Sequence, residues 1–172
     1  MTMHAQELKS LPPDAWEEVQ AGEHQPWGGL GEELRWADKQ RHIGIHDEDG
    51  RLLALAGLTV VQVQAGAEPA FPVVGLGGVI VTRSRRGEGL TRPLLEETMR
   101  LAGEVGPERA MLFCDTGLRG LYGRHGFAEI AAAVIADQPD GPVQMPLLAM
   151  WAPLAVGVGW PPGDVRVLGL PF

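Results

Sequence analysis

A glycine-rich turn between an apolar strand and an amphipathic helix is the feature that most constrains this chain. The run Arg86-Gly87-Glu88-Gly89-Leu90-Thr91 follows the apolar stretch of residues 75–81. It precedes apolar and small residues that recur at helical spacing, namely Leu94, Leu95, Thr98 and Met99. The first N–H groups of a helix have no partner within it, and the positive end of the helix dipole lies beside them. With Arg85 and Arg86 adjacent, the turn predicts an anion site of the kind that binds a pyrophosphate. An ordinary solvated turn fits the same residues, because short glycine motifs also match by chance.

The bulk composition fits a single globular domain and excludes several other classes. We expect one domain over residues 1–172, with a core at about 43–154 and an extended tail at 155–172. A net charge of −8 argues against a nucleic-acid partner. The single cysteine, Cys114, lies in an apolar run and is expected to be a buried thiol, and the scattered histidines predict no metal site. Without a signal-peptide core or a membrane-spanning stretch, we expect a cytoplasmic protein that has no membrane partner.

Hydrophobic periodicity and turn residues predict a mixed α/β chain. Helices are expected at residues 15–22, 31–39, 117–125 and from about 89–90 onward, where Pro93 fits only an early helical position. Strands are expected at residues 43–46, 52–63, 71–81, 109–114, 128–136 and 143–154. The acidic turn at residues 47–50 predicts a hairpin between the first two strands. Glycines inside the strand at 71–81, especially Gly77 and Gly78, predict a bulge or a close approach by a ligand.

The order of these elements resembles the GNAT superfamily of acyl-CoA-dependent N-acyltransferases. Arg86 and Gly89 match the turn pattern of that family, Arg/Gln-x-x-Gly-x-Gly/Ala, although Thr91 stands where glycine or alanine is usual. The segment Leu121-Tyr122-Gly123-Arg124-His125-Gly126-Phe127 is similar to the family pattern Tyr-x-x-x-Gly-Phe after the following strand. The resemblance covers about residues 43–154. It implies an α/β (α+β) fold with a mixed central sheet, a splayed central strand pair and flanking helices.

Membership of that family implies acetyl-CoA as co-substrate and no metal. The pyrophosphate would lie on the backbone amides of the turn, and the pantetheine arm would pair with the strand before it as an added strand does. The residues implied to bind the co-substrate are Val79, Ile80, Val81, Arg85, Arg86, Gly87, Glu88, Gly89, Leu90 and Thr91. Glycines just upstream would then form the bulge that separates this strand from its neighbour. Packing between strands would require small residues there as well.

Tyr122, the only tyrosine, is the residue that the resemblance assigns to catalysis. A tyrosine is protonated at neutral pH and can act as general acid toward the departing CoA thiolate. Packing against Phe127 would account for the same residue without catalysis. The general base stays open, because the stretch of residues 76–79 has no carboxylate where many family members have a glutamate. Candidate substitutes are Asp115, His125, Glu32, Glu33 and Asp164, and a neutral substrate amine would need no base.

The tail gives one indication of the acceptor. Trp160-Pro161-Pro162-Gly163-Asp164-Val165 is similar to the Trp-x-x-Gly-Asp-Val ending of aminoglycoside N-acetyltransferases, although this chain continues to Phe172. Carried over, Asp164 would bind a small, cationic amine as substrate. The alternative is a CoA-binding sensor or scaffold domain without catalysis. The missing strand glutamate and the threonine at position 91 are compatible with that alternative. The sequence leaves the acyl length open and is compatible with a monomer or a homodimer.

Overall fold

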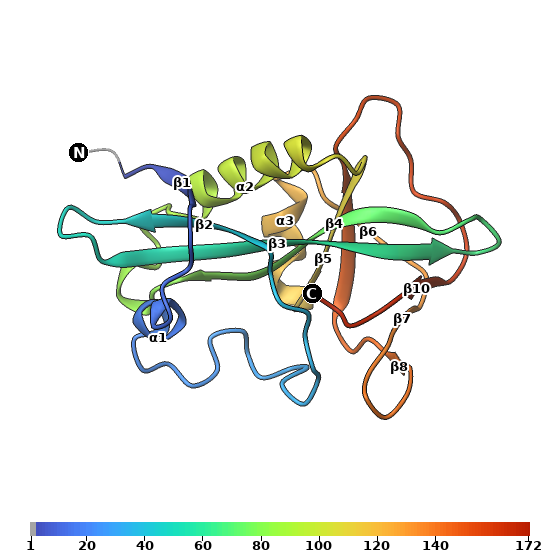
Figure 1. Cartoon of the computed structure of the whole chain (residues 1–172), viewed down its shortest axis with the longest axis horizontal. Coiled ribbons are helices and arrows are strands. Elements are labelled where there is room, and N and C mark those ends of the chain that lie inside the picture. Colours follow the sequence, from blue (N-terminus) through green and yellow to red (C-terminus); the bar gives the residue numbers. More distant parts are fainter. Residues whose placement is uncertain (1–2) are drawn as a thin grey trace.

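The computed structural model describes residues 3–172, which form one mixed sheet with helices on both faces (Figure 1). The strands are β1 (Ala5–Leu8), β2 (Arg41–His46), β3 (Leu52–Ala65), β4 (Phe71–Val81), β5 (Arg109–Cys114), β6 (Ala128–Glu129), β7 (Val134–Ala136), β8 (Val143–Gln144), β9 (Leu148–Pro153) and β10 (Val165–Val167). The helices are α1 (Ala15–Gln20), α2 (Thr91–Val105) and α3 (Arg119–Gly123), with short 3-10 turns η1 (Arg83–Arg85) and η2 (Thr116–Leu118). The main strand order is β6-β9-β5-β4-β3-β10-β7-β8, and β2 pairs with both β1 and β3.

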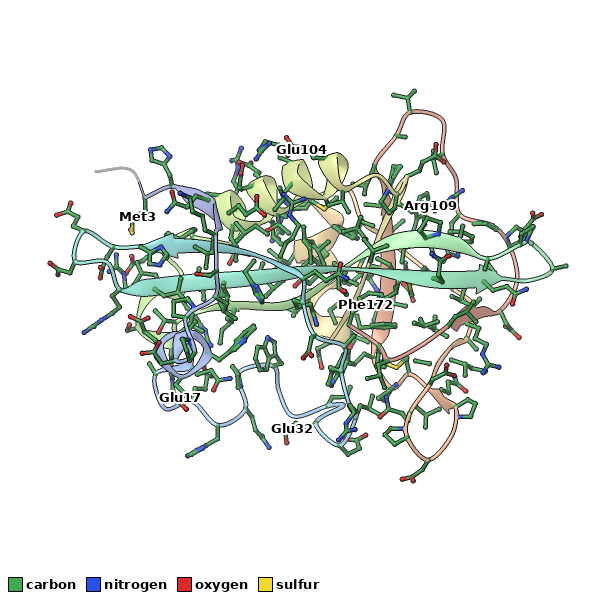
Figure 2. The ribbon with its side chains drawn as sticks, viewed as in Figure 1. Met3, Glu17, Glu32, Glu104, Arg109 and Phe172 are labelled. Atoms are coloured by element: carbon green, nitrogen blue, oxygen red, sulfur yellow. The ribbon has the colours of Figure 1, made fainter. Side chains whose placement is uncertain are left out.

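Helices α1 and α2 cover opposite faces of the sheet (Figure 1). Neighbouring residues of a strand point to opposite faces, and Leu53 of β3 packs in the same core cluster as Leu94 of α2. Leu52, its neighbour, packs with Val19 of α1. Figure 2 shows Glu104 of α2 and Glu17 of α1 on opposite sides of the strands, with Phe172 near the middle of the molecule. The two core layers hold β3 and β4 rigidly between them.

A bulge interrupts the pairing of β3 with β4, as the glycines in this strand predict. Gly57 pairs with Gly77 and Leu55 pairs with Ile80, so β4 carries one more residue than β3 in this interval. Gly78 has a φ of +60°, a conformation that glycine adopts at low cost. The bulge lies where β4 leaves β5, since the parallel pairing of those two strands ends at Leu76 with Leu112. The splayed central pair expected of the GNAT fold is therefore confirmed.

Two groups of local predictions are wrong. Residues 31–34 form turns and 35–39 have no regular secondary structure, in place of a helix, because Gly28, Gly29 and Gly31 hold positive φ angles and the Trp36 indole donates back to the Gly31 carbonyl (3.1 Å). The stretch 128–136 is divided between β6, which pairs with β9, and β7, which pairs with β10. Likewise, 143–154 is divided into β8 and β9. Apolar alternation alone cannot show that a chain crosses from one end of a sheet to the other.

Strands β1 and β10 are not predicted by the sequence patterns, and β10 lies in the expected tail at 155–172, where it pairs with β3 and β7. The other elements lie close to their predicted positions. The hairpin turn at residues 47–50 joins β2 and β3, and the helix after the glycine turn begins at Thr91, with Pro93 as its third residue. The Asp47 carboxylate closes the hairpin by accepting from the N–H groups of Asp49 and Arg51. Within residues 3–172, no helix has both the length and the apolar character that a membrane crossing requires.

Candidate active site

The turn before α2 presents a row of unpaired backbone donors. Within the described chain, the N–H groups of Gly87, Gly89, Leu90 and Thr91 have no backbone or side-chain acceptor. Gly87 (φ +84°) and Gly89 (φ +80°) adopt left-handed conformations, and a Cβ on either would meet no atom within 4 Å. The four donors stand at the positive end of a 15-residue helix. Such a turn can bind several oxygens of one anion.

Both arginines beside the turn are engaged by carboxylates. Arg85 Nε lies 2.7 Å from a carboxylate oxygen of Glu88 within the turn. Arg86 makes a two-point ion pair with Glu23, in which Nη1 lies 2.9 Å from Oε1. The Arg86 guanidinium holds the pKa of the Glu23 carboxyl below its usual range. Arg86 Nε also donates to the Val81 carbonyl (3.0 Å), which links the turn to the end of β4.

A groove of about 450 Å³ runs from the turn to α3. Its lining residues come from α2, from the turn and from the Tyr-x-x-x-Gly-Phe segment, and they are Gly89, Thr91, Arg92, Glu96, Leu121, Arg124 and His125. The tertiary structure thus joins the two sequence motifs at one surface. Arg92 in this wall is paired with Glu96 (2.7 Å), so Arg124 is the lining arginine without a carboxylate partner among the described residues.

Beyond the bulge, alternate residues of β4 direct their backbone groups away from β3, toward the gap between β4 and β5. Ile80 pairs with Leu55 of β3, and the N–H of Thr82, two residues further along, donates to the Leu53 carbonyl (2.7 Å). Because adjacent residues of a strand direct their backbone groups to opposite edges, Val79 and Val81 present theirs on the edge facing away from β3. An extended ligand could pair with Val79 and Val81 there, whereas the backbone of Ile80 is already used by the sheet.

Tyr122 follows the lining residue Leu121 in α3 and lies in the main core cluster, with its ring edge-on to Phe127 at 6.0 Å between ring centroids. The residue is only 6% exposed, and its hydroxyl makes no hydrogen bond to another described residue. Burial, together with the neighbouring Cys114, raises the pKa of Tyr122 well above its usual value. The side chain is therefore protonated throughout the physiological range and can donate its proton in a hydrogen bond.

Two of the carboxylates considered as a base accept hydrogen bonds within their own segments. Asp115 accepts from the Gly117 N–H at the start of η2 (2.8 Å), and Glu32 accepts from Gln25 (3.1 Å). Asp164 lies at the tip of the β3–β4 hairpin, where its carbonyl accepts from the Gly66 N–H (2.9 Å). That tip is eight residues along β3 from the Gly57–Gly77 pair, or roughly 26 Å at about 3.3 Å per residue. The structure does not bring Asp164 to the bulge.

The side chains around the bulge come from residues outside the two sequence motifs. A Cβ on Gly78 would lie 2.5 Å from the Trp16 ring, and one on Gly77 would lie 2.6 Å from Cε of Lys39. The Trp16 ring packs edge-on against Trp27 (5.9 Å between ring centroids) and against His42 (6.5 Å). Burial lowers the pKa of both Lys39 and His42. These residues come from separate segments with no shared spacing, so no sequence pattern could have predicted that they meet at the bulge.

Comparison with known proteins agrees with this geometry. The model of the acetyltransferase (GNAT) family matches residues 4–127. The chain belongs to the GNAT family. No curated protein matches the sequence. The GNAT fold is found in a GNAT family N-acetyltransferase (YhbS) from Escherichia coli in complex with CoA, which is 20% identical with a TM-score of 0.60, over 99% of this chain and 97% of that one.

A second GNAT structure is somewhat more similar in sequence. A GNAT family acetyltransferase from Brucella melitensis in complex with acetyl-CoA is 26% identical with a TM-score of 0.54, over 94% of each chain. ElaA from Escherichia coli is 21% identical with a TM-score of 0.55, over 88% of this chain and 99% of that one. As a GNAT acetyltransferase, this chain is an enzyme of acetyl-CoA-dependent acetyl transfer. Its described residues include no group of three or more side chains arranged to hold a metal ion.

Proposed function

We propose that this GNAT enzyme transfers the acetyl group of acetyl-CoA to the primary amine of a small acceptor by direct attack. The observation that carries the proposal is the row of unpaired N–H groups at Gly87, Gly89, Leu90 and Thr91, which opens on the groove between α2 and α3. A pyrophosphate needs several donors within reach of one another, and this turn supplies them. Arg124 adds charge that favours the phosphates of CoA, whereas the charge of Arg92 is offset by Glu96 at 2.7 Å.

The outward edge of β4 supports the placement of the pantetheine arm. Val79 and Val81 direct N–H and carbonyl groups outward at the spacing of a strand edge, and an amide-bearing arm can pair with them. In this structure the Val79 carbonyl accepts from Trp27 and the Val81 carbonyl from Arg86, both at 3.0 Å. The thioester then lies near the bulge, where β4 and β5 have separated. A neutral amine attacks the thioester carbonyl carbon, forming the C–N bond while the C–S bond breaks. The proton leaves the amine for solvent, and the electron pair of the C–S bond goes to sulfur.

Tyr122 is proposed as the general acid for the leaving group. An ordinary tyrosine pKa already exceeds that of a thiol, which is near ~8.5, and burial raises the pKa of Tyr122 further. Complete proton transfer from Tyr122 to the thiolate is therefore unfavourable. The hydroxyl therefore acts chiefly as a hydrogen-bond donor to sulfur while charge develops in the transition state. Since the hydroxyl makes no hydrogen bond to another described residue, this donor is available.

The Tyr122→Phe variant tests this assignment. We expect kcat to fall about a hundredfold, as is typical when a positioned acid is lost, while the Kd for acetyl-CoA stays at its wild-type value. Isothermal titration with acetyl-CoA gives Kd, and CoA thiol release in the presence of an amine panel gives kcat. Equal kcat in variant and wild type would remove Tyr122 from the reaction. Acetyl-CoA binding without thiol release for any amine would favour the sensor or scaffold alternative.

The expectation that the acceptor is cationic loses its main support. Asp164 is the residue that suggested a cationic acceptor, and it lies at the far end of the β3–β4 hairpin. We therefore propose a primary amine without specifying its charge. The cytoplasmic location and the choice between monomer and homodimer stay predictions.

A further inference from the structure

The segment of residues 21–30, here called the strap, joins α1 to the turns before β2 and crosses the outer edge of β4. Two of its side chains touch the groups expected to hold acetyl-CoA. The Trp27 indole N–H donates to the Val79 carbonyl (3.0 Å). Glu23 pairs with the guanidinium of Arg86 through both carboxylate oxygens. These contacts join residues 52 and 63 positions apart, so they are tertiary and not products of local folding.

Each contact has the chemistry of the ligand part that would replace it. The Val79 carbonyl lies on the edge facing away from β3, where a pantetheine amide would donate its N–H; the Trp27 indole donates an N–H to the same oxygen. Arg86 stands beside the turn that would hold the pyrophosphate, and the Glu23 carboxylate offers it two anionic oxygens. Two groups of the expected acetyl-CoA site, the Val79 carbonyl and the Arg86 guanidinium, are therefore already bound by side chains of the strap.

The strap is held mainly by these contacts and by the edge-on packing of Trp27 on Trp16. Trp27 is 45% exposed, so it is not anchored in the core. Gly22 (φ +79°) and Gly28 (φ +84°) lie on either side of Trp27, and both positions allow the backbone to turn. Little apolar area has to be uncovered for the strap to move away from β4.

We propose that the strap is an intramolecular stand-in for acetyl-CoA, in which Trp27 and Glu23 occupy the pantetheine and pyrophosphate contacts and are displaced when the co-substrate binds. The inference rests on the proposed function, because it takes the edge of β4 and the turn as the acetyl-CoA site. A ligand that binds only molecules with an open strap has an observed affinity reduced by the fraction of such molecules. Weakening the strap raises that fraction and therefore tightens acetyl-CoA binding.

Two variants and two matched controls test the displacement. Trp27→Phe keeps the ring and removes the N–H, and Glu23→Gln keeps the shape and removes the charge. Each is expected to lower the Kd for acetyl-CoA about threefold to tenfold, the range for one hydrogen bond or ion pair. Trp160→Phe removes a buried indole N–H that has no partner in the described structure, and Glu68→Gln removes an exposed charge in the β3–β4 turn, away from the strap. Both controls are expected to leave Kd unchanged.

Hydrogen exchange gives a second readout that does not depend on substitution. On addition of acetyl-CoA to the wild-type protein, amides of residues 21–30 are expected to exchange faster, and those of residues 79–91 more slowly. Protection of residues 21–30 would show a lid that closes over the ligand and would overturn the proposal. Unchanged Kd in Trp27→Phe and Glu23→Gln, with intact wild-type binding, would also overturn it and leave the proposed function standing. If neither the wild type nor either variant bound acetyl-CoA, the strap and the proposed function would both be wrong.

Discussion

Replacing Gly89 by alanine separates the folding role of the turn from its binding role. Gly89 has a φ of +80°, and a Cβ there meets no atom within 4 Å, so the strain is confined to its own backbone. An alanine in this conformation costs about 1 kcal/mol, which lowers Tm by roughly 2–4 °C for a chain of this size. Gly50 is the matched control, because it has a φ of +79° and equally open surroundings in the β2–β3 hairpin. Both variants should lose similar stability.

Acetyl-CoA distinguishes the two glycine variants. The added Cβ at position 89 occupies the open space from which a phosphate would approach the turn, so one hydrogen bond to the phosphate is expected to be lost. Losing one hydrogen bond to a charged phosphate costs about 1.5–3 kcal/mol, or roughly a tenfold to hundredfold increase in Kd for Gly89→Ala. At a concentration of about 100 times the wild-type Kd, the ligand stabilises the wild type and Gly50→Ala by about 2.7 kcal/mol. A variant that binds about a hundredfold more weakly then retains only about 0.4 kcal/mol. Thermal-shift titration measures both values. Equal ligand-induced shifts for the two variants would refute the placement of the pyrophosphate on this turn.

Three other predictions concern single side chains. Burial and, to a smaller extent, the charge of nearby Lys39 lower the pKa of His42 from 6.5, so His42 binds a proton more readily in the unfolded chain than in the folded protein. The free energy of unfolding should be highest above about pH 6.5 and should fall as the pH drops below it; denaturant titration should show a flatter profile for His42→Gln. Burial raises the pKa of Cys114 to about 11, so iodoacetamide at about pH 8 should alkylate the folded protein about a hundredfold more slowly than the unfolded chain; a comparable rate would contradict this burial. Asp164→Asn should leave KM for both cationic and neutral amines unchanged, and a higher KM for cations alone would return Asp164 to the acceptor site.

Much of the fold could be predicted from the sequence because its strongest signals are local. The hairpin at residues 47–50, strand β4, the start of α2 near Pro93 and strand β5 all follow from turn residues, periodicity and proline geometry within a few residues. The bulge was predictable for the same reason, since two adjacent glycines weaken a regular strand and favour a local break in its pairing. Residues 31–39 were mispredicted because apolar spacing suggested a helix, whereas glycines with positive φ and the Trp36 contact impose turns.

The turn that precedes α2 and the segment that carries Tyr122 follow from the order of their residues, because each is a short run whose chemistry depends on its own backbone. Tertiary packing brings these two runs to one groove, and it decided that Val79 and Val81, but not Ile80, direct their backbone groups away from β3. It also decided that Trp27 and Glu23 reach across to β4 and Arg86. Contacts between segments so far apart depend on how the whole sheet packs its two faces, and no local pattern of residues encodes that packing.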